Sequence, residues 1–239
     1  MTKKLPLLLA ALALSLPALA APSVPSNEVL DADLAAVLAR LGARPVAISD
    51  HARARVRAQL ERRLQKPTLR ETWQRKKAAW PVIARELKAR GLPEEVGYLA
   101  WAESGFRADL PATSMGSRGV WQFIPKTARA YGLTVDEHVD DRLDLAKETH
   151  AASEYLSKLL GEFGKDSPLL ALAAYNAGEH AIHKILDGLA AKDGGQKPEH
   201  RDFFWLTERK LLPDEASEYV PAILAAALIG THPEKYGLE

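Results

Sequence analysis

Apolar residues recur at helical spacing along most of this 239-residue chain, and this periodicity constrains the fold more than any other feature. The segment from Asp31 to Leu41 shows the i, i+3, i+4, i+7 spacing of a single helix face, with apolar side chains at Leu34, Val37, Leu38 and Leu41. No stretch shows the sustained alternation of apolar and polar residues that is typical of half-buried strands. The sequence therefore predicts an all-α fold.

The same spacing, together with boundary residues, predicts further helices over residues 49–64, 68–90, 93–103, 125–132, 145–163, 168–176, 179–189 and 215–230. Pro81 lies inside one of them. Proline lacks a backbone N–H and clashes with the preceding turn, so we expect that helix to divide at Pro81. Gly91 is expected to end its second half.

The first 21 residues have the parts of a secretory signal peptide. A positively charged start precedes a largely apolar run over residues 5–16, and small residues follow at Ala18 and Ala20. The run is shorter than the roughly 20 apolar residues of a membrane-spanning helix, and Pro17 interrupts its end. We therefore expect cleavage near Ala20 or Ala21, export to the periplasm of a host with an outer membrane, and no stable membrane anchor.

Charge and cysteine content exclude several classes of protein. The 32 Lys and Arg residues nearly balance the 31 Asp and Glu residues, so no overall positive field indicates nucleic-acid binding. Cysteine is absent, which removes disulfides, thiolate metal ligands, a cysteine nucleophile and the cysteine that a lipoprotein anchor requires.

Glu103 is the first candidate for a catalytic group. It ends an apolar run, YLAWA at residues 98–102, and is followed at once by SGF. A carboxyl group among aromatic neighbours is poorly solvated, which raises its pKa. A general acid that works near neutral pH needs a pKa raised in this way. Taken alone, the same observation also fits an exposed glutamate at a helix end.

Four blocks of sequence, in a fixed order, change that judgement. They are GLP (91–93) with YL (98–99) and AESGF (102–106), GSRGVWQFIP (116–125), ALAAYNAG (171–178) and EASEYVP (215–221). In this order they resemble the family-1 lytic transglycosylases with their goose-lysozyme-like SLT domain, and most closely the murein transglycosylase D branch, here without LysM repeats. The resemblance implies a lysozyme-like, all-α catalytic domain over 80–239. We expect a helical extension over 22–79 and a signal peptide over 1–21 to precede it.

The resemblance implies non-hydrolytic cleavage of peptidoglycan glycan strands, with Glu103 as the single catalytic acid and base. Glu103 would protonate the oxygen between N-acetylmuramic acid and N-acetylglucosamine. It would then take the proton of the muramic C6 hydroxyl, which closes on C1 to leave a 1,6-anhydro end. Most glycosidases need two carboxylates. One suffices here because the nucleophile belongs to the substrate, and neither metal nor cofactor is needed.

The resemblance also implies a substrate cleft, with contacts from Thr113, Ser114, Gln122, Tyr175, Asn176, Glu215 and Tyr219. Tyr175 is implied to project toward Glu103, where its hydroxyl can bond the carboxylate or the substrate, and Tyr219 is implied to orient that carboxylate. Asn176 is more often structural at this position. Gln122 either contacts sugar or braces its loop. Glu215, one helical turn before Tyr219, either faces the cleft or interacts with the helix dipole.

Several alternatives stay open at this point. Thr113 stands where the family has a serine, with Ser114 beside it, and either hydroxyl can face the cleft. A goose-type muramidase would use the same glutamate with water, and Asp109 is the nearest candidate for its second carboxylate. A catalytically inactive wall-binding scaffold is the alternative from another class. The dense basic residues between Arg53 and Lys77 indicate a solvated helix face or attraction to the anionic cell wall.

Overall fold

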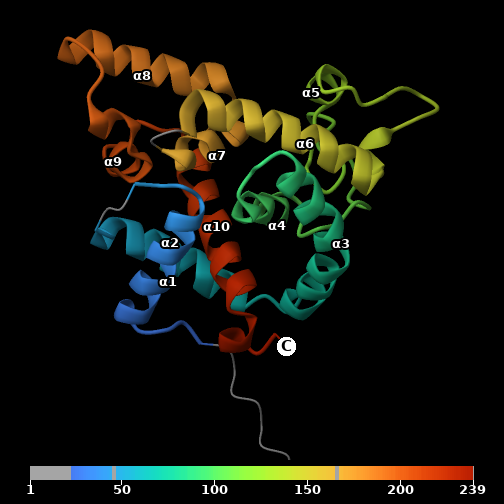
Figure 1. Cartoon of the computed structure of the whole chain (residues 1–239), viewed down its shortest axis with the longest axis horizontal. Helices are drawn as coiled ribbons and strands as arrows, with labels where there is room; N and C mark the ends of the chain where they lie inside the picture. Colours follow the sequence, from blue (N-terminus) through green and yellow to red (C-terminus); the bar gives the residue numbers. More distant parts are fainter. Residues whose placement is uncertain (1–22, 45–46, 165–166, 239) are drawn as a thin grey trace, which may run out of the picture.

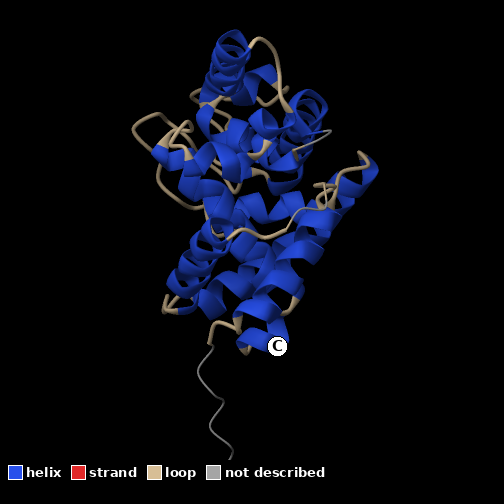
Figure 2. Ribbon diagram, turned by 90° about the vertical axis from the view of Figure 1, so that its left-hand side faces the viewer, coloured by secondary structure: helices blue, strands red, loops and turns tan. Residues whose placement is uncertain are grey.

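A computed structural model describes residues 23–44, 47–164 and 167–238. The predicted signal peptide lies outside these ranges. Regular structure in the described residues is helical, and Figure 2 shows helices throughout. The longer helices are α1 Asn27–Arg40, α2 Asp50–Leu64, α3 Leu69–Ala89, α6 Leu145–Leu159, α7 Pro168–Ala177, α8 Glu179–Asp193 and α10 Asp214–Thr231. The short ones are α4 Leu99–Glu103, α5 Pro125–Ala130 and α9 Phe203–Glu208. The predicted all-α fold is confirmed.

Short turns of tighter or wider helix connect these elements. They are η1 Glu94–Tyr98, η2 Asp141–Leu143, η3 Leu160–Gly164, η4 Pro198–Arg201 and η5 Pro233–Tyr236. Two isolated bridges, Arg118 with Phe123 and Val135 with Asp140, tie the loops on either side of α5. Within the described ranges, no helix combines the length and the apolar character needed to cross a membrane.

Helix α10 is the central element of the core. Its side chains from Val220 to Ile229 are almost all fully buried, because the sequence VPAILAAALI is apolar on every face. It packs against α1, α2, α4 and α7, and Figure 1 shows it as the red helix in the middle of the molecule. Small residues allow close approach: a Cβ at Gly230 would come within 3.0 Å of the Tyr98 ring.

The expected division at Pro81 is wrong, because α3 runs unbroken from Leu69 to Ala89. The proline removes one backbone hydrogen bond, to the carbonyl of Lys77 four residues earlier. Lys77 is exposed, so water can satisfy that carbonyl. Ile83 and Leu87 beyond the proline are fully buried, and α3 packs against α6 and η1. Tertiary packing therefore outweighs the local cost of the proline. The helix ends, as expected, before Gly91, which adopts a φ of 69°.

The N-terminal helices pack on the rest of the chain through polar contacts to α10. The Arg55 guanidinium lies 2.7 Å from the Glu218 carboxylate, and the Gln59 amide donates to the same carboxylate at 2.6 Å. The Arg63 guanidinium donates to the Ala222 carbonyl at 3.0 Å. Helix α3 runs across residue 80 as one element, and the division of the chain into an extension and a catalytic domain at that residue stays a prediction.

Several of the basic residues between Arg53 and Lys77 therefore face inward, and a purely solvated face is too simple an interpretation. Lys76 is buried with its ammonium 4.0 Å from the centroid of the Trp80 ring, and burial lowers its pKa to about 8. The Arg75 guanidinium donates to the Gly105 carbonyl at 2.9 Å, immediately after the helix that ends at Glu103. These cations join the N-terminal helices to the segment that carries the candidate acid.

Candidate active site

Glu103 is the last residue of α4, and the chain turns sharply after it. Gly105 and Phe106 both adopt a left-handed backbone, with φ of 61° and 59°. Ser104 is buried, and its hydroxyl donates to the Val120 carbonyl at 2.8 Å. The helix end that bears Glu103 is thereby attached to the loop that precedes α5. This attachment holds the Glu103 backbone in one place.

The Glu103 carboxyl is partly buried and lines a cavity. Burial disfavours its charged form and raises its pKa to about 7, as its apolar sequence neighbours predict. The Tyr219 hydroxyl donates a short hydrogen bond to its Oε1, which acts in the opposite direction and lowers the pKa. The nearby charge of Glu215 raises it further. Glu103 is thus a carboxyl group that can give and take a proton near neutral pH.

Tyr219 and Glu215 reach this carboxyl from the first two turns of α10. They share a helix face, as their spacing predicts. The Asn176 side chain, at the end of α7, donates to Glu215 Oε1 at 3.2 Å. Asn176 therefore joins α7 to α10 across the site. Glu215 also lies in the first turn of its helix. It can therefore interact with the helix dipole and lie beside Glu103 at the same time.

Tyr175 comes close to Glu103, but its hydroxyl is used elsewhere. The Tyr175 hydroxyl donates to the Trp121 carbonyl at 2.8 Å. This bond stands in place of the implied bond to the Glu103 carboxylate. Burial and the charge of Glu103 raise the pKa of Tyr175 well above its usual value. The ring is stacked against Tyr155, with centroids 5.2 Å apart. Tyr175 thus positions the loop that contains Trp121.

The contacts of Gln122 support the bracing interpretation, because the nitrogen and the oxygen of its side-chain amide both form hydrogen bonds within the loop. Its nitrogen donates to the Gly119 carbonyl at 2.7 Å, and its oxygen accepts from the Ser117 hydroxyl at 3.0 Å. The backbone of Gln122 has a φ of 52°, which the loop imposes on a residue other than glycine. The Trp121 ring beside it is fully buried and belongs to the core.

Thr113 and Ser114 lie in the exposed loop between Glu103 and Gly116. The Thr113 hydroxyl lies 2.8 Å from the Ser117 hydroxyl, so it extends the chain of hydrogen bonds that ends on Gln122. Among the hydrogen bonds of the described residues, neither Thr113 nor Ser114 is bonded to Glu103. Thr113 faces the Gln122 loop, and a direct part in the site stays a prediction for both residues.

Glu148 is a residue that the sequence analysis did not single out. It lies on α6, is fully buried, and accepts hydrogen bonds from the backbone N–H groups of Val120 at 3.1 Å and Trp121 at 3.2 Å. Burial raises its pKa to about 8, against these two donors. It holds the loop whose carbonyls bond Ser104 and Tyr175. A charged residue within an otherwise apolar face of α6 was the signal that could have identified it.

We expect Glu148→Ala to lower the free energy of unfolding by about 2–4 kcal/mol, because two buried N–H groups lose their acceptors. Chemical denaturation measures this. Glu154→Ala on the same helix is the matched control: its carboxylate pairs with Arg90 at 3.1 Å near the surface and should contribute at most about 1 kcal/mol. Equal losses in the two variants would contradict the anchoring role of Glu148.

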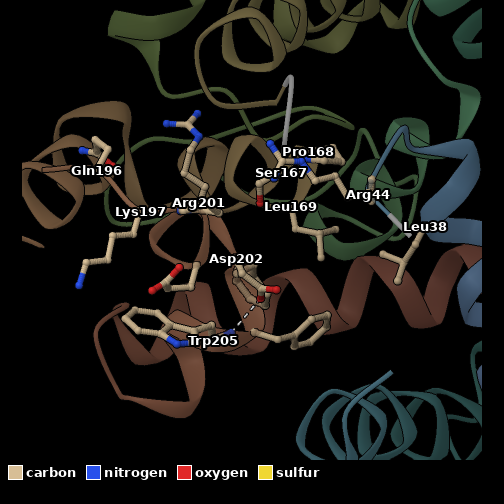
Figure 3. Close-up of a pocket in the computed structure, with 15 residues that line it drawn as sticks. Leu38, Arg44, Ser167, Pro168, Leu169, Gln196, Lys197, Arg201, Asp202 and Trp205 are labelled. Atoms are coloured by element: carbon tan, nitrogen blue, oxygen red, sulfur yellow. Dashed lines mark hydrogen bonds between the residues drawn. The ribbon is translucent and has the colours of Figure 1, made fainter. Parts of the chain in front are cut away.

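The structure contains two cavities of similar volume, and one of them adjoins the candidate site. One, of about 510 Å³, adjoins Glu103 and is lined by the end of α2, the start of α3 and the segment after α4. The other, of about 570 Å³, lies between α1, the start of α7 and the η4–α9 segment (Figure 3). The residues that line the second cavity include Leu38, Leu169 and Trp205, and no candidate site residue is among those described there. The first cavity is therefore the one that belongs to the site.

Two other groups of ionisable residues form ion pairs or lie on the surface. Asp109 is exposed and pairs with Arg107 at 3.0 Å, which holds the pKa of that carboxyl below its usual value. His183 bonds to Glu162, while His180 on the same helix is exposed. Within the part of the chain that the structure describes, no three His, Cys, Asp or Glu side chains are grouped so as to hold a metal ion.

The fold and this site define a lysozyme-like helical domain with a partly buried, protonatable carboxyl group at a helix end. Residues 81–195 match the family model described as the transglycosylase SLT domain. This match, over a little less than half of the chain, agrees with the resemblance that the four sequence blocks indicate. Glu103, Gln122 and Tyr175 lie inside the matched residues, whereas Glu215 and Tyr219 reach the site from α10 beyond them.

Individual proteins agree with the family model. Over 157 residues, or 65% of this chain, it is 37% identical to membrane-bound lytic murein transglycosylase D of Escherichia coli K12, but it spans only 32% of that protein's length. It is 42% identical to peptidoglycan transglycosylase gp16 of phage T7 over 82 residues, which are 34% of this chain and 6% of that protein.

A solved structure supports the fold independently. The inactive mutant of lytic transglycosylase Slt from Pseudomonas aeruginosa superposes with a TM-score of 0.50 at 23% identity. The match covers 65% of this chain and 24% of that chain. The likeness confirms the lysozyme-like SLT fold.

Proposed function

We propose that this chain is an exported peptidoglycan lytic transglycosylase, in which Glu103 alone serves as acid and base. The observation that carries the proposal is the Glu103 carboxyl itself, which is partly buried, bonded by Tyr219 and has its pKa raised to about 7. The SLT domain and the names of the similar proteins support the same chemistry. The predicted signal peptide supports export to the cell wall.

The reaction follows from two successive proton transfers at Glu103, one from the carboxyl group and one to it. Protonated Glu103 gives its proton to the oxygen between N-acetylmuramic acid and N-acetylglucosamine as the bond to muramic C1 breaks. The resulting carboxylate then takes the proton of the muramic C6 hydroxyl as that oxygen bonds to C1. No water is consumed, the product is a 1,6-anhydro end, and Glu103 is again protonated. The hydrogen bond from Tyr219 stabilises the carboxylate between the two steps.

Mass spectrometry of the products formed from purified peptidoglycan tests the proposal. We expect muropeptides with 1,6-anhydromuramic ends, which are lighter by one water than the products of hydrolysis. Reducing ends alone would mean hydrolysis by a goose-type muramidase and would overturn the proposal. Asp109 is exposed and paired with Arg107, so Glu215 would then be the second carboxylate to test. Wall binding without any product would favour the scaffold alternative.

The pH profile of the reaction should carry the signature of Glu103. The acid must start protonated, so the rate is expected to be constant below the Glu103 pKa and to fall as pH rises through about 7. The Tyr219 hydroxyl lowers that pKa, so Tyr219→Phe should move the alkaline limb to higher pH. Tyr131→Phe is the matched control, because its ring packs on Tyr155 and Tyr131 is not among the groups that shift the pKa of Glu103. A limb that stays in place in Tyr219→Phe would contradict the assignment.

A further inference from the structure

The 510 Å³ cavity beside Glu103 contains more positive charge than its own carboxylates neutralise. Arg63, Lys66, Arg75 and Arg107 all line it. Arg107 pairs with Asp109 at 3.0 Å, and Arg75 lies 3.9 Å from Glu71 while it donates to the Gly105 carbonyl. Two of the four cations are therefore neutralised within the wall.

The remaining two cations, Arg63 and Lys66, have no carboxylate partner among the residues that the structure describes. Lys66 is exposed at the rim, between α2 and α3. Arg63 is nine-tenths buried, with its guanidinium 5.6 Å from the centroid of the Trp101 ring and one hydrogen bond, to the neutral Ala222 carbonyl. Its Nε–H group is buried without any partner. A buried cation without a counter-charge is costly, and an anion in the cavity would offset this cost.

The proposed substrate contains one kind of anionic group. Its N-acetyl sugars are neutral, and the only charged substituent is the lactyl group on O3 of muramic acid. That group is a free carboxylate on a bare strand. On a peptide-bearing strand it is an amide that continues into a stem with its own carboxylates. The cavity opens next to Glu103, and therefore next to the bond to be cleaved, so a substituent of a nearby muramic residue comes within its reach. Its volume lies within the range of small-ligand sites, about 300–1,000 Å³.

We propose that Arg63 and Lys66 form a carboxylate-binding site in this cavity, which holds the acidic substituent of muramic acid during cleavage. The proposal rests on the proposed function and adds to it a specificity determinant in the N-terminal helices. Arg63 supplies a positioned charge on the wall, and Lys66 supplies a mobile one at the rim.

Lys66→Glu is the variant that tests the site, because Lys66 is exposed and its removal does not disturb the core. Lys77→Glu is the matched control: it makes the same charge change on an exposed residue of α3 that does not line the cavity. Formation of anhydro products would be followed on uncrosslinked strands that bear peptide stems and on strands stripped of them by an amidase. We expect KM to rise about tenfold in Lys66→Glu, with kcat unchanged, and neither value to change in Lys77→Glu.

The two substrates distinguish the source of the carboxylate. A rise in KM on peptide-bearing strands alone identifies a carboxylate of the stem, and a rise on stripped strands alone identifies the lactyl carboxylate. A rise on both means that the site accepts either. Raising the ionic strength should reduce each of these effects. Equal KM values for wild type and Lys66→Glu on both substrates would overturn the proposal.

A binding measurement separates this proposal from the reaction itself. In the Glu103→Gln background, Lys66→Glu should weaken binding of the anionic strands and leave binding of N-acetylglucosamine oligomers, which have no carboxylate, unchanged. Equal weakening for both ligands would mean a general loss of the cleft and would also overturn the proposal. Failure of wild type to form anhydro ends, with the charge-dependent binding intact, would instead count against the proposed function.

Discussion

Glu103→Gln is expected to lower kcat by about a thousandfold or more, because the amide can neither donate a proton to the leaving oxygen nor accept one from the C6 hydroxyl. Glutamine has nearly the shape of glutamate, so binding of glycan strands should persist. Product formation by mass spectrometry and strand binding by sedimentation with sacculi measure the two effects separately. Lysis at an unchanged rate would remove Glu103 from the mechanism.

The same variant should be more stable than wild type at alkaline pH. The pKa of Glu103 is raised from an ordinary 4.5 to about 7 in the folded protein. The stability that belongs to its protonated form is therefore present below pH 4.5 and is lost as pH rises through 7. Glu103→Gln avoids this loss. We therefore expect the free energy of unfolding of the variant to exceed that of wild type by up to about 3 kcal/mol at pH 8, and to equal it at pH 4. Glu61→Gln, at an exposed position on α2, should show no such difference.

Gly119→Ala is the substitution with the largest expected effect on folding. Gly119 has a φ of 84°, and a Cβ there would come within 3.0 Å of both the Arg142 carbonyl oxygen and Glu148 Oε2. A backbone carbonyl cannot move aside as a flexible side chain can. The loop would have to leave Glu148, and with it the attachments of Ser104 and Tyr175. We expect a loss of about 3 kcal/mol or more in unfolding free energy, or failure to fold.

Gly188→Ala is the control for the same chemical change. Gly188 is exposed within α8, and a Cβ there meets no atom within 4 Å. Alanine in a helix interior costs less backbone entropy than glycine, so this variant should gain about 0.5–1 kcal/mol. Thermal unfolding of both variants distinguishes them. A Gly119→Ala protein as stable as wild type would contradict the close packing of the loop against α6.

The helices were largely predictable from the sequence because most of them have a clear apolar face or clear boundary residues. The expected break at Pro81 was wrong, since packing of the residues beyond it against α6 and η1 outweighs one lost hydrogen bond. The pKa of Glu103 was predictable in direction from its apolar neighbours in sequence, because burial is the largest cause of the shift. The partner of Tyr175 was not: the Trp121 carbonyl lies 54 residues away in sequence, and only the fold brings it near.

The sequence by itself determined the all-α class, the SLT domain and Glu103 as the candidate acid, since periodicity and short motifs record local requirements. The resemblance implied Tyr219 beside that acid, and only the tertiary structure decided what else surrounds it. Tyr219 reaches Glu103 across 116 residues, and Arg63 lines its cavity from α2. Hydrogen bonds and burial of this kind depend on how the helices pack, and charge counts along a chain do not reveal them. A basic stretch that looks like a solvated surface can therefore line the cavity beside the candidate acid.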